Sequence, residues 1–110
     1  MDKIPVLNQN REFRRVYTKG NAYVDGILVT YVLKNRNGQV RYGITTSKKI
    51  GCAVERNRAR RIIREAVRQT LPCLSCGADL VFVARTRTVQ MKSVDLVRVL
   101  RRQMKKAGLL

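Results

Sequence analysis

The sequence contains no histidine, and only 7 acidic residues accompany its 24 lysines and arginines. Acid–base catalysis and catalytic metal sites are built mainly from histidine and carboxylate side chains. In this chain the few carboxylates form no cluster along the sequence. We therefore predict no catalytic residue and no metal ligand in the protein itself. If the protein takes part in catalysis, we expect the reactive groups to belong to a partner.

Long apolar segments are also missing. No run approaches the roughly 20 apolar residues that a membrane-spanning helix needs. Residues 1–5 lack the apolar core of a signal peptide. We therefore expect no contact with a membrane and a cytoplasmic location.

Cysteine is scarce and occurs only at Cys52, Cys73 and Cys76. An odd number argues against a complete set of disulfides. Cys73 and Cys76 have the two-residue spacing of zinc and redox sites, but zinc prefers four ligands and the chain offers only one further cysteine. Free structural thiols are the favoured interpretation, and a redox or intermolecular metal site is the alternative.

Positive charge, in contrast, is abundant. The net charge of +17 opposes compaction unless a polyanion neutralises it, which makes a nucleic acid the first expected partner. Hydrophobic residues make up 45% of the 110 residues, which is enough for a core. We expect residues 1–110 to form a single basic domain, since so short a chain leaves little room for a second folding unit.

Hydrophobic periodicity and turn residues predict a helix, three strands, a helix, a strand and a final helix. In chain order these elements are expected at 8–19, within 22–34 with a break at Asp25-Gly26, at 40–45, at about 54–69, at 80–84 and from Ser93 to about Gly108. This α-β-β-β-α-β-α order predicts an α+β fold in which helices pack on one mostly antiparallel sheet, as in ribosomal proteins.

Local signals refine these elements. Asn8 or Asn10 is expected to cap the first helix and Ser93 the last, because short polar side chains favour that position. Asn37-Gly38 predicts a tight hairpin between the strands on either side. The uninterrupted apolar run 80–84 predicts a central strand that is covered on both faces.

The predicted helix at 54–69 carries the main functional signal. One side bears an apolar stripe that predicts a face turned to the core: Ala59, Ile62, Ile63, Ala66 and Val67. At about 100° per residue, a polar sector lies opposite this stripe: Asn57, Arg60, Arg61, Arg64 and Arg68. Further basic residues flank or precede it: Arg56, Arg58, Lys48 and Lys49.

Such a row suits a phosphate backbone, because the planar guanidinium binds phosphate through two donors. The alternative is a solvated face whose charges pair with acids along the helix. Only Glu55 and Glu65 lie nearby, so most of the charge is expected to be unpaired. Binding of a polyanion is therefore the favoured interpretation.

The segment from Gly43 to Glu65 closely resembles the signature of the ribonuclease P protein subunit. In that family a serine, two lysines and a glycine lead into a basic Arg-Asn-Arg helix, and these correspond here to Ser47-Lys48-Lys49, Gly51 and Arg56-Asn57-Arg58. The run Phe13-Arg14-Arg15-Val16-Tyr17, with Gly20, resembles the first helix of the family. The order of strands and helices agrees along nearly the whole chain.

This resemblance implies a subunit of a ribonucleoprotein that removes the 5′ leader of precursor tRNA, in which the RNA hydrolyses the phosphodiester with Mg²⁺ that it holds itself. It implies an RNA-subunit-binding surface comprising Lys48, Lys49, Arg56, Asn57, Arg58, Arg60, Arg61, Arg64 and Arg68. It also implies a leader-binding cleft comprising Phe13, Tyr17, Val29 and Tyr31, where ordinary core packing is the alternative role for Phe13 and Tyr17. A left-handed crossover from strand through helix to parallel strand is implied as well, and a monomer is expected to bind one RNA.

The chain departs from the family pattern in two places. The basic leading segment is nearly absent before Leu7, and Cys52 stands where a polar or basic residue is usual. A structural ribosomal-type RNA-binding protein without an enzymatic role is the alternative function. A third possibility is a DNA-compacting protein, which would need no aromatic cleft.

Overall fold

The computed structural model describes residues 4–110, and in them the predicted order of elements is found. The helices are α1 (Asn10–Lys19), α2 (Ala53–Thr70) and α3 (Ser93–Lys106), and the strands are β1 (Asn21–Val24), β2 (Leu28–Lys34), β3 (Val40–Thr45) and β4 (Ala78–Ala84). Short 3₁₀ helices occupy Lys48–Ile50, Leu71–Cys73 and Thr86–Gln90. The predicted α+β class is confirmed.

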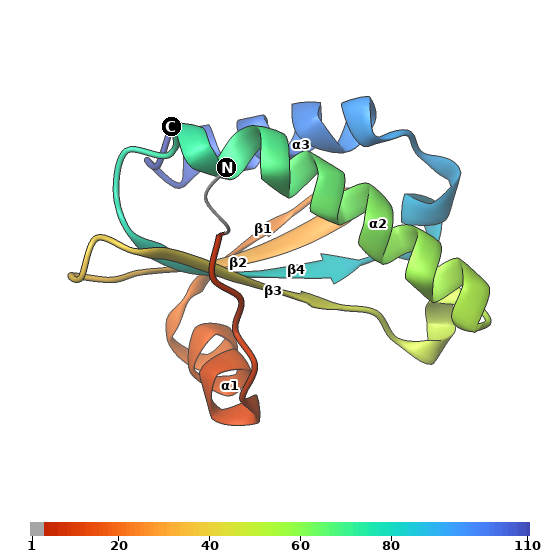
Figure 1. The fold of residues 1–110 in the computed structure, drawn as a ribbon, viewed down its shortest axis with the longest axis horizontal. Helices are drawn as coiled ribbons and strands as arrows, with labels where there is room; N and C mark the ends of the chain where they lie inside the picture. The colour runs from red at the N-terminus through yellow and green to blue at the C-terminus, as the bar shows by residue number, and fades with distance from the viewer. Residues whose placement is uncertain (1–3) are drawn as a thin grey trace.

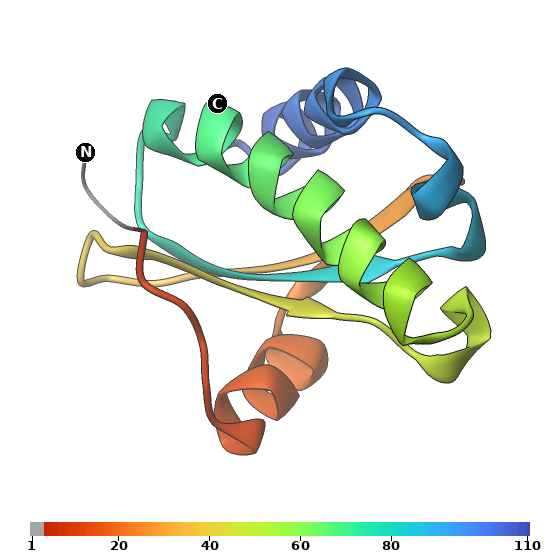
Figure 2. The same ribbon diagram turned by 45° about the vertical axis from the view of Figure 1, so that its right-hand side comes forward.

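The strands form one mixed sheet in the order β1-β2-β4-β3. Helices α2 and α3 lie side by side on one face, and α1 covers part of the other (Figures 1 and 2). Strand β4 lies inside the sheet, antiparallel to β2 and parallel to β3, and most of its residues are buried. The prediction of a central, doubly covered strand is therefore confirmed.

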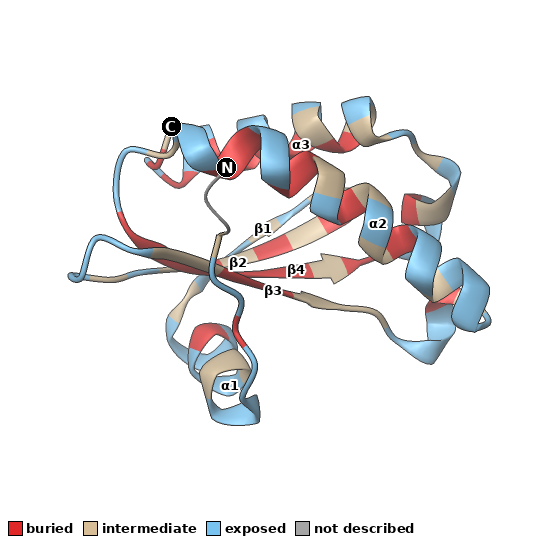
Figure 3. Ribbon diagram, in the orientation of Figure 1, coloured by how far each residue is buried: buried red, intermediate tan, exposed pale blue. Residues whose placement is uncertain are grey.

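Alternation along the strands separates two cores. Leu28, Thr30 and Val32 of β2 are buried on the α2/α3 face, where Thr30 donates a hydrogen bond to Gln103 of α3 at 2.6 Å. The intervening residues of β2 point to the α1 face, where a smaller cluster forms around Val16 and Val81. The main core thus fixes α2 and α3, and the smaller one holds α1. Figure 3 shows the buried stripe along α2.

The predicted hairpin across Asn37-Gly38 is wrong, because β2 and β3 are not neighbours. The turn itself forms, with Gly38 at a φ of 75°, but β4 enters between the two strands. Gly77 packs so tightly under the turn that an added Cβ would lie 2.7 Å from the Cα of Gly38. The long apolar β4 takes the inner position because pairing on both edges satisfies its buried backbone.

The crossover from β3 through α2 to β4 joins parallel neighbours. Viewed from the helical face with these strands pointing upward, β4 lies to the left of β3, which is the left-handed sense (Figures 1 and 2). Most such connections are right-handed. The handedness implied by the resemblance is therefore found.

The helix caps differ from the prediction. Helix α1 begins after Gln9, whose backbone N–H donates to the carboxylate of Glu12 at 3.1 Å. Helix α3 begins after Lys92, whose N–H donates to Asp95 at 3.0 Å, so Ser93 is the first helical residue. In both helices a carboxylate in the first turn reaches back to the cap, and this interaction also suits the positive end of the helix dipole.

Cys52, Cys73 and Cys76 are free but exposed, so none of them packs in the core as a structural thiol would. Across residues 4–110, no helix combines the length and apolar character that crossing a membrane requires.

Candidate nucleic-acid interface

Helix α2 is fixed to the sheet through one face. Ala59, Ile63, Ala66 and Val67 are almost fully buried, as predicted, whereas Ile62 is only partly buried at the edge of the core. The side chains that face away from this stripe therefore project from a fixed backbone. A ligand that approaches α2 would meet the residues on this outer side.

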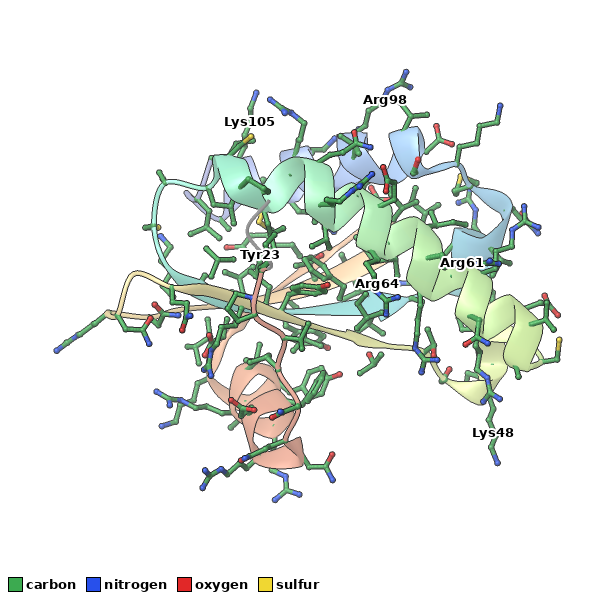
Figure 4. All side chains as sticks on the ribbon, viewed as in Figure 1. Tyr23, Lys48, Arg61, Arg64, Arg98 and Lys105 are labelled. Carbon is green, nitrogen blue, oxygen red and sulfur yellow. The ribbon has the colours of Figure 1, made fainter. Side chains whose placement is uncertain are left out.

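The outer side carries the predicted polar sector, which we call the arginine row (Asn57, Arg60, Arg61, Arg64 and Arg68). Arg61, Arg64 and Arg68 are exposed, and Arg60 is partly buried. Together with exposed Val54, most of the row lines a hollow of about 590 Å³: Asn57, Arg60, Arg61 and Arg64. Figure 4 shows Arg61 and Arg64 pointing from α2 over the β3 side of the molecule. The sequence pattern did not indicate Val54 as part of this surface, because Val54 is apolar, although it lies in line with the row one turn before Asn57.

Pairing with acids affects only one end of this row. Arg68 binds both carboxylate oxygens of Glu65, at 2.7 and 2.8 Å, and Gln69 donates to the same carboxylate at 3.1 Å. The hydrogen bond from Arg68, followed by that from Gln69, lowers the pKa of Glu65 below its ordinary value. Arg68 is thus partly neutralised, which agrees with the expectation that most, but not all, of the charge in this row is unpaired.

The remaining cations of the row are available. Arg60 donates to the side-chain oxygen of Asn57 at 3.4 Å. Within the described part of the chain, Arg60, Arg61 and Arg64 have no carboxylate within salt-bridge distance, and neither have the flanking Arg56 and Arg58. These guanidinium groups therefore keep donors that a phosphate can accept.

Lys48 and Lys49 precede α2 in a short 3₁₀ helix and are both exposed. Lys48 points away from the molecule near the beginning of α2 (Figure 4). Gly51 connects the two helices with a φ of 137°, a conformation that glycine adopts far more readily than other residues. The two lysines extend the positive surface beyond the N-terminal end of the row.

The residues expected to hold the leader come together on the opposite face of the sheet. Tyr17 of α1 and Tyr31 of β2 meet edge to face, with ring centroids 4.8 Å apart. The hydroxyl of Tyr17 also lies 3.3 Å from that of Thr45 in β3. Val29 shares this face of β2 and is partly buried. We call Phe13, Tyr17, Val29 and Tyr31 the aromatic surface.

Phe13 differs from the other members of this surface. Its ring lies directly on Gly43, where an added Cβ would approach ring carbons to 2.4 Å. It also packs against the small core formed by Leu7, Val16 and Val81. Phe13 therefore contributes to holding α1 on the sheet, whereas Tyr17, with 38% of its surface exposed, is accessible to a ligand.

A charged network that the sequence did not reveal fixes the beginning of α1. The guanidinium of Arg41 donates twice to Asp79, at 3.0 and 2.8 Å, and once to Glu12, at 2.8 Å. Asp79, followed by Glu12, raises the pKa of Arg41 above its ordinary value, outweighing the effect of burial. Because the partners are 29 and 38 residues away, no local pattern indicates this network.

Potential metal ligands remain dispersed. Within residues 4–110, no three cysteine or carboxylate residues gather closely enough to hold a metal ion. The groups that the two surfaces present are suited to binding: guanidinium groups along α2 can contact phosphates, and the aromatic rings can stack on unpaired bases.

Comparisons with known proteins agree with this geometry. The sequence model of the family described as Ribonuclease P matches residues 1–108. The ribonuclease P protein component of Clostridium botulinum strain Loch Maree is 40% identical over 104 residues, which cover 94% of each protein. The structure of the Staphylococcus aureus RNase P protein is similar with a TM-score of 0.82 and 30% identity, covering 97% of this chain and 98% of that one. The RNase P protein of Thermotoga maritima, at 24% identity and a TM-score of 0.79, covers 91% of this chain and 94% of its own and supports the fold.

Proposed function

Because the chain belongs to the ribonuclease P protein family, we propose that its arginine row binds the RNA subunit and that its aromatic surface receives the 5′ leader of precursor tRNA. As a member of this family, the chain is a protein subunit of an endoribonuclease that matures the 5′ end of tRNA. The proposal concerns which residues bind which RNA.

The observation that carries the first part is the set of unpaired guanidinium groups on a core-fixed helix. Arg60, Arg61 and Arg64 line one hollow and lie out of reach of the acids in the described chain. Each guanidinium offers a fixed pair of donors to a phosphate without first breaking a salt bridge. Asn57, Arg56, Arg58, Arg68, Lys48 and Lys49 complete the proposed RNA-subunit-binding surface.

The second part rests on the accessible aromatic rings. Stacking on an unpaired base tolerates any sequence, because every base has a π face. Tyr17 and Tyr31 present adjoining rings on the sheet face that α2 does not occupy. Phe13 and Val29 support and extend the same surface. The 5′ leader is therefore placed on the opposite side of the sheet from the RNA subunit.

Catalysis belongs to the RNA in this family, and the described residues offer no ligand cluster for a metal. We place the Mg²⁺ ions that the family implies on the RNA subunit. One protein monomer would bind one RNA in the cytoplasm.

Reconstitution tests this assignment. The protein is added to a bacterial ribonuclease P RNA at low magnesium, and 5′ cleavage of precursor tRNA is measured. The native chain is expected to restore cleavage, whereas the R60Q/R61Q/R64Q variant should bind the RNA roughly 100-fold more weakly at about 0.15 M salt, because each lost phosphate contact lowers the salt slope by about 0.7–0.9. A variant with the same loss of charge elsewhere, R11Q/K19Q/R36Q, serves as the control.

The leader surface needs a different comparison. Replacing Tyr17 by Ala should weaken binding of precursor tRNA to the holoenzyme by about 1–3 kcal/mol and leave mature tRNA unaffected. Equal losses for both RNAs would contradict the leader assignment. An R60Q/R61Q/R64Q variant that binds the RNA subunit no more weakly than the control variant would contradict the docking assignment.

A further inference from the structure

Helix α3 carries a second row of cations that the proposed function does not use. Arg98, Arg101, Arg102 and Lys105 are all exposed and are spaced as i, i+3, i+4 and i+7. This spacing places them on one side of the helix, over a length of about 10 Å. We call these four residues the α3 row. The same spacing is found for Asn57, Arg60, Arg61 and Arg64 in the arginine row of α2.

The backbone beneath the α3 row is fixed. Leu96, Leu100 and Met104 on the inner side are fully buried in the main core. Gln103, which is also buried, donates to the backbone oxygen of Leu28 in β2 at 3.0 Å. The outward side chains therefore extend from a helix that is held both by apolar packing and by hydrogen bonds to the sheet.

Acids do little to neutralise the α3 row. Arg102 approaches Asp25 at 3.5 Å, a long contact between side chains that are partly open to solvent. Asp95, the acid in the helix itself, accepts the backbone N–H of Lys92 at the N-terminus. Among residues 4–110, Arg98, Arg101 and Lys105 have no carboxylate within salt-bridge distance.

The two rows point in different directions. Arg98 and Lys105 extend from the side of α3 that faces away from the sheet, while Arg61 and Arg64 extend over the β3 side (Figure 4). Helices α2 and α3 pack side by side between these directions. One straight stretch of nucleic-acid backbone along the arginine row would not follow the α3 row as well.

The chemistry of the α3 row suits phosphates and offers no aromatic surface for bases. No aromatic residue lies in α3, and its only exposed large apolar side chain is Val94. Single-stranded recognition commonly uses aromatic stacking, whereas contacts to a duplex go mainly to phosphates. The aromatic surface lies on the other side of the sheet, so the leader is an unsuitable partner for this row.

We propose that the α3 row is a second docking surface for the RNA subunit, which binds the phosphate backbone of a duplex segment separate from the one that α2 contacts. This inference rests on the proposed function, because it takes the RNA subunit as the partner of α2. Two rows on a pair of fixed helices would then set the orientation of the protein on the RNA, since a single row permits rotation about its own axis.

The test compares three triple variants of the full chain, each of which loses three positive charges. R98Q/R101Q/K105Q removes most of the α3 row and leaves the contact between Arg102 and Asp25 in place. R60Q/R61Q/R64Q removes the centre of the arginine row, and R11Q/K19Q/R36Q is the control. Affinity for a bacterial ribonuclease P RNA is measured from about 0.05 to 0.5 M salt, and thermal unfolding shows that each variant is folded.

Loss of the α3 row is expected to lower the salt slope by about 2–3 and the affinity on the order of 100-fold at about 0.15 M salt, since three phosphate contacts disappear. The control should change both much less. Combining the α2 and α3 variants should multiply their separate losses, because the rows contact different segments.

Two results would overturn the inference while leaving the proposed function intact: an α3 variant that behaves like the control while the α2 variant fails, or a loss seen only when precursor tRNA binds to the assembled holoenzyme. The latter would assign the row to the substrate. Failure of the α2 variant to weaken binding would instead count against the proposed function itself.

Discussion

Arg41 and Arg64 are two arginines on opposite sides of the sheet, and their guanidinium groups differ in whether they are bound within the protein. The guanidinium of Arg41 donates three hydrogen bonds to Asp79 and Glu12, and the side chain of Arg41 is only 29% exposed. Arg64 is exposed and has no carboxylate partner in the described chain. The two residues have the same charge, but the donors of Arg41 are bound to carboxylates and those of Arg64 are not.

This difference separates structural arginines from those available to RNA. The donors of Arg41 join the beginning of α1 to β3 and β4, and so help to fix the helix that carries Tyr17. The donors of Arg64 are exposed to solvent, and no carboxylate in the described chain pairs with them. In a chain with a net charge of +17, the number of arginines therefore overestimates the number of phosphate contacts.

The largest effect on folding is expected for Arg41→Met. This change keeps the length of the side chain but leaves Asp79, whose side chain is only 7% exposed, without its charged partner. The free energy of unfolding should fall by about 2–3 kcal/mol, as for a partly buried ion pair. Urea denaturation measures it, with Arg64→Met as the matched control, which should change stability by less than about 0.5 kcal/mol. Similar losses for both variants would remove the distinction.

RNA binding should show the reverse order. Arg64→Met is expected to weaken binding to the RNA subunit about fivefold at about 0.15 M salt and to lower the salt slope by about 0.7–0.9. Arg41→Met should leave the slope unchanged, because the donors of Arg41 are bound to Asp79 and Glu12. Salt titrations of the two variants make the measurement. A flattened slope for Arg41→Met would place Arg41 among the RNA contacts.

The smallest effect concerns Arg68, which stands between the two cases. Glu65→Gln removes the carboxylate that binds Arg68 at 2.7 Å and takes one negative charge from α2, which we propose to face the RNA. Affinity for the RNA subunit should rise by about twofold to fivefold, since an exposed ion pair of this kind is weak. Fluorescence binding assays detect such a change, and the double variant E65Q/R68Q should lose the gain. Weaker binding of Glu65→Gln would show that Glu65 itself contributes a contact.

Much of the fold follows from local patterns in the sequence. The spacing of Ala59, Ile63 and Ala66 predicts the buried side of α2, and the apolar run of β4 predicts its central place. The strand pairing does not follow, because Asn37-Gly38 specifies a turn but does not specify that the strands on either side of it pair with each other. The inner position of β4 depends on contacts between residues far apart in the sequence, and the left-handed crossover came only from the family resemblance.

The candidate site is predicted to a similar extent. Helical periodicity places Arg60, Arg61 and Arg64 together, since their neighbours lie within one or two turns. The same reasoning misses the dual role of Phe13, whose contact with Gly43 joins two elements, and it misses Arg41 altogether. The pairing of Arg68 with Glu65 could have been predicted from the sequence, because an acid three residues away on a helix commonly pairs with arginine.

The inner position of β4 also bears on how the chain folds during synthesis. Strand β3 ends at Thr45, yet the strand that pairs with it begins only at Ala78, after the whole of α2. A nascent chain that stops before residue 78 therefore holds a β1–β2 hairpin and a basic helix with no completed sheet to cover its apolar stripe. Pairings between distant residues form slowly because loop closure must come first. Packing of α2 onto the sheet thus waits for the ribosome to deliver β4, and pulsed hydrogen exchange should show β2, β3 and β4 becoming protected together.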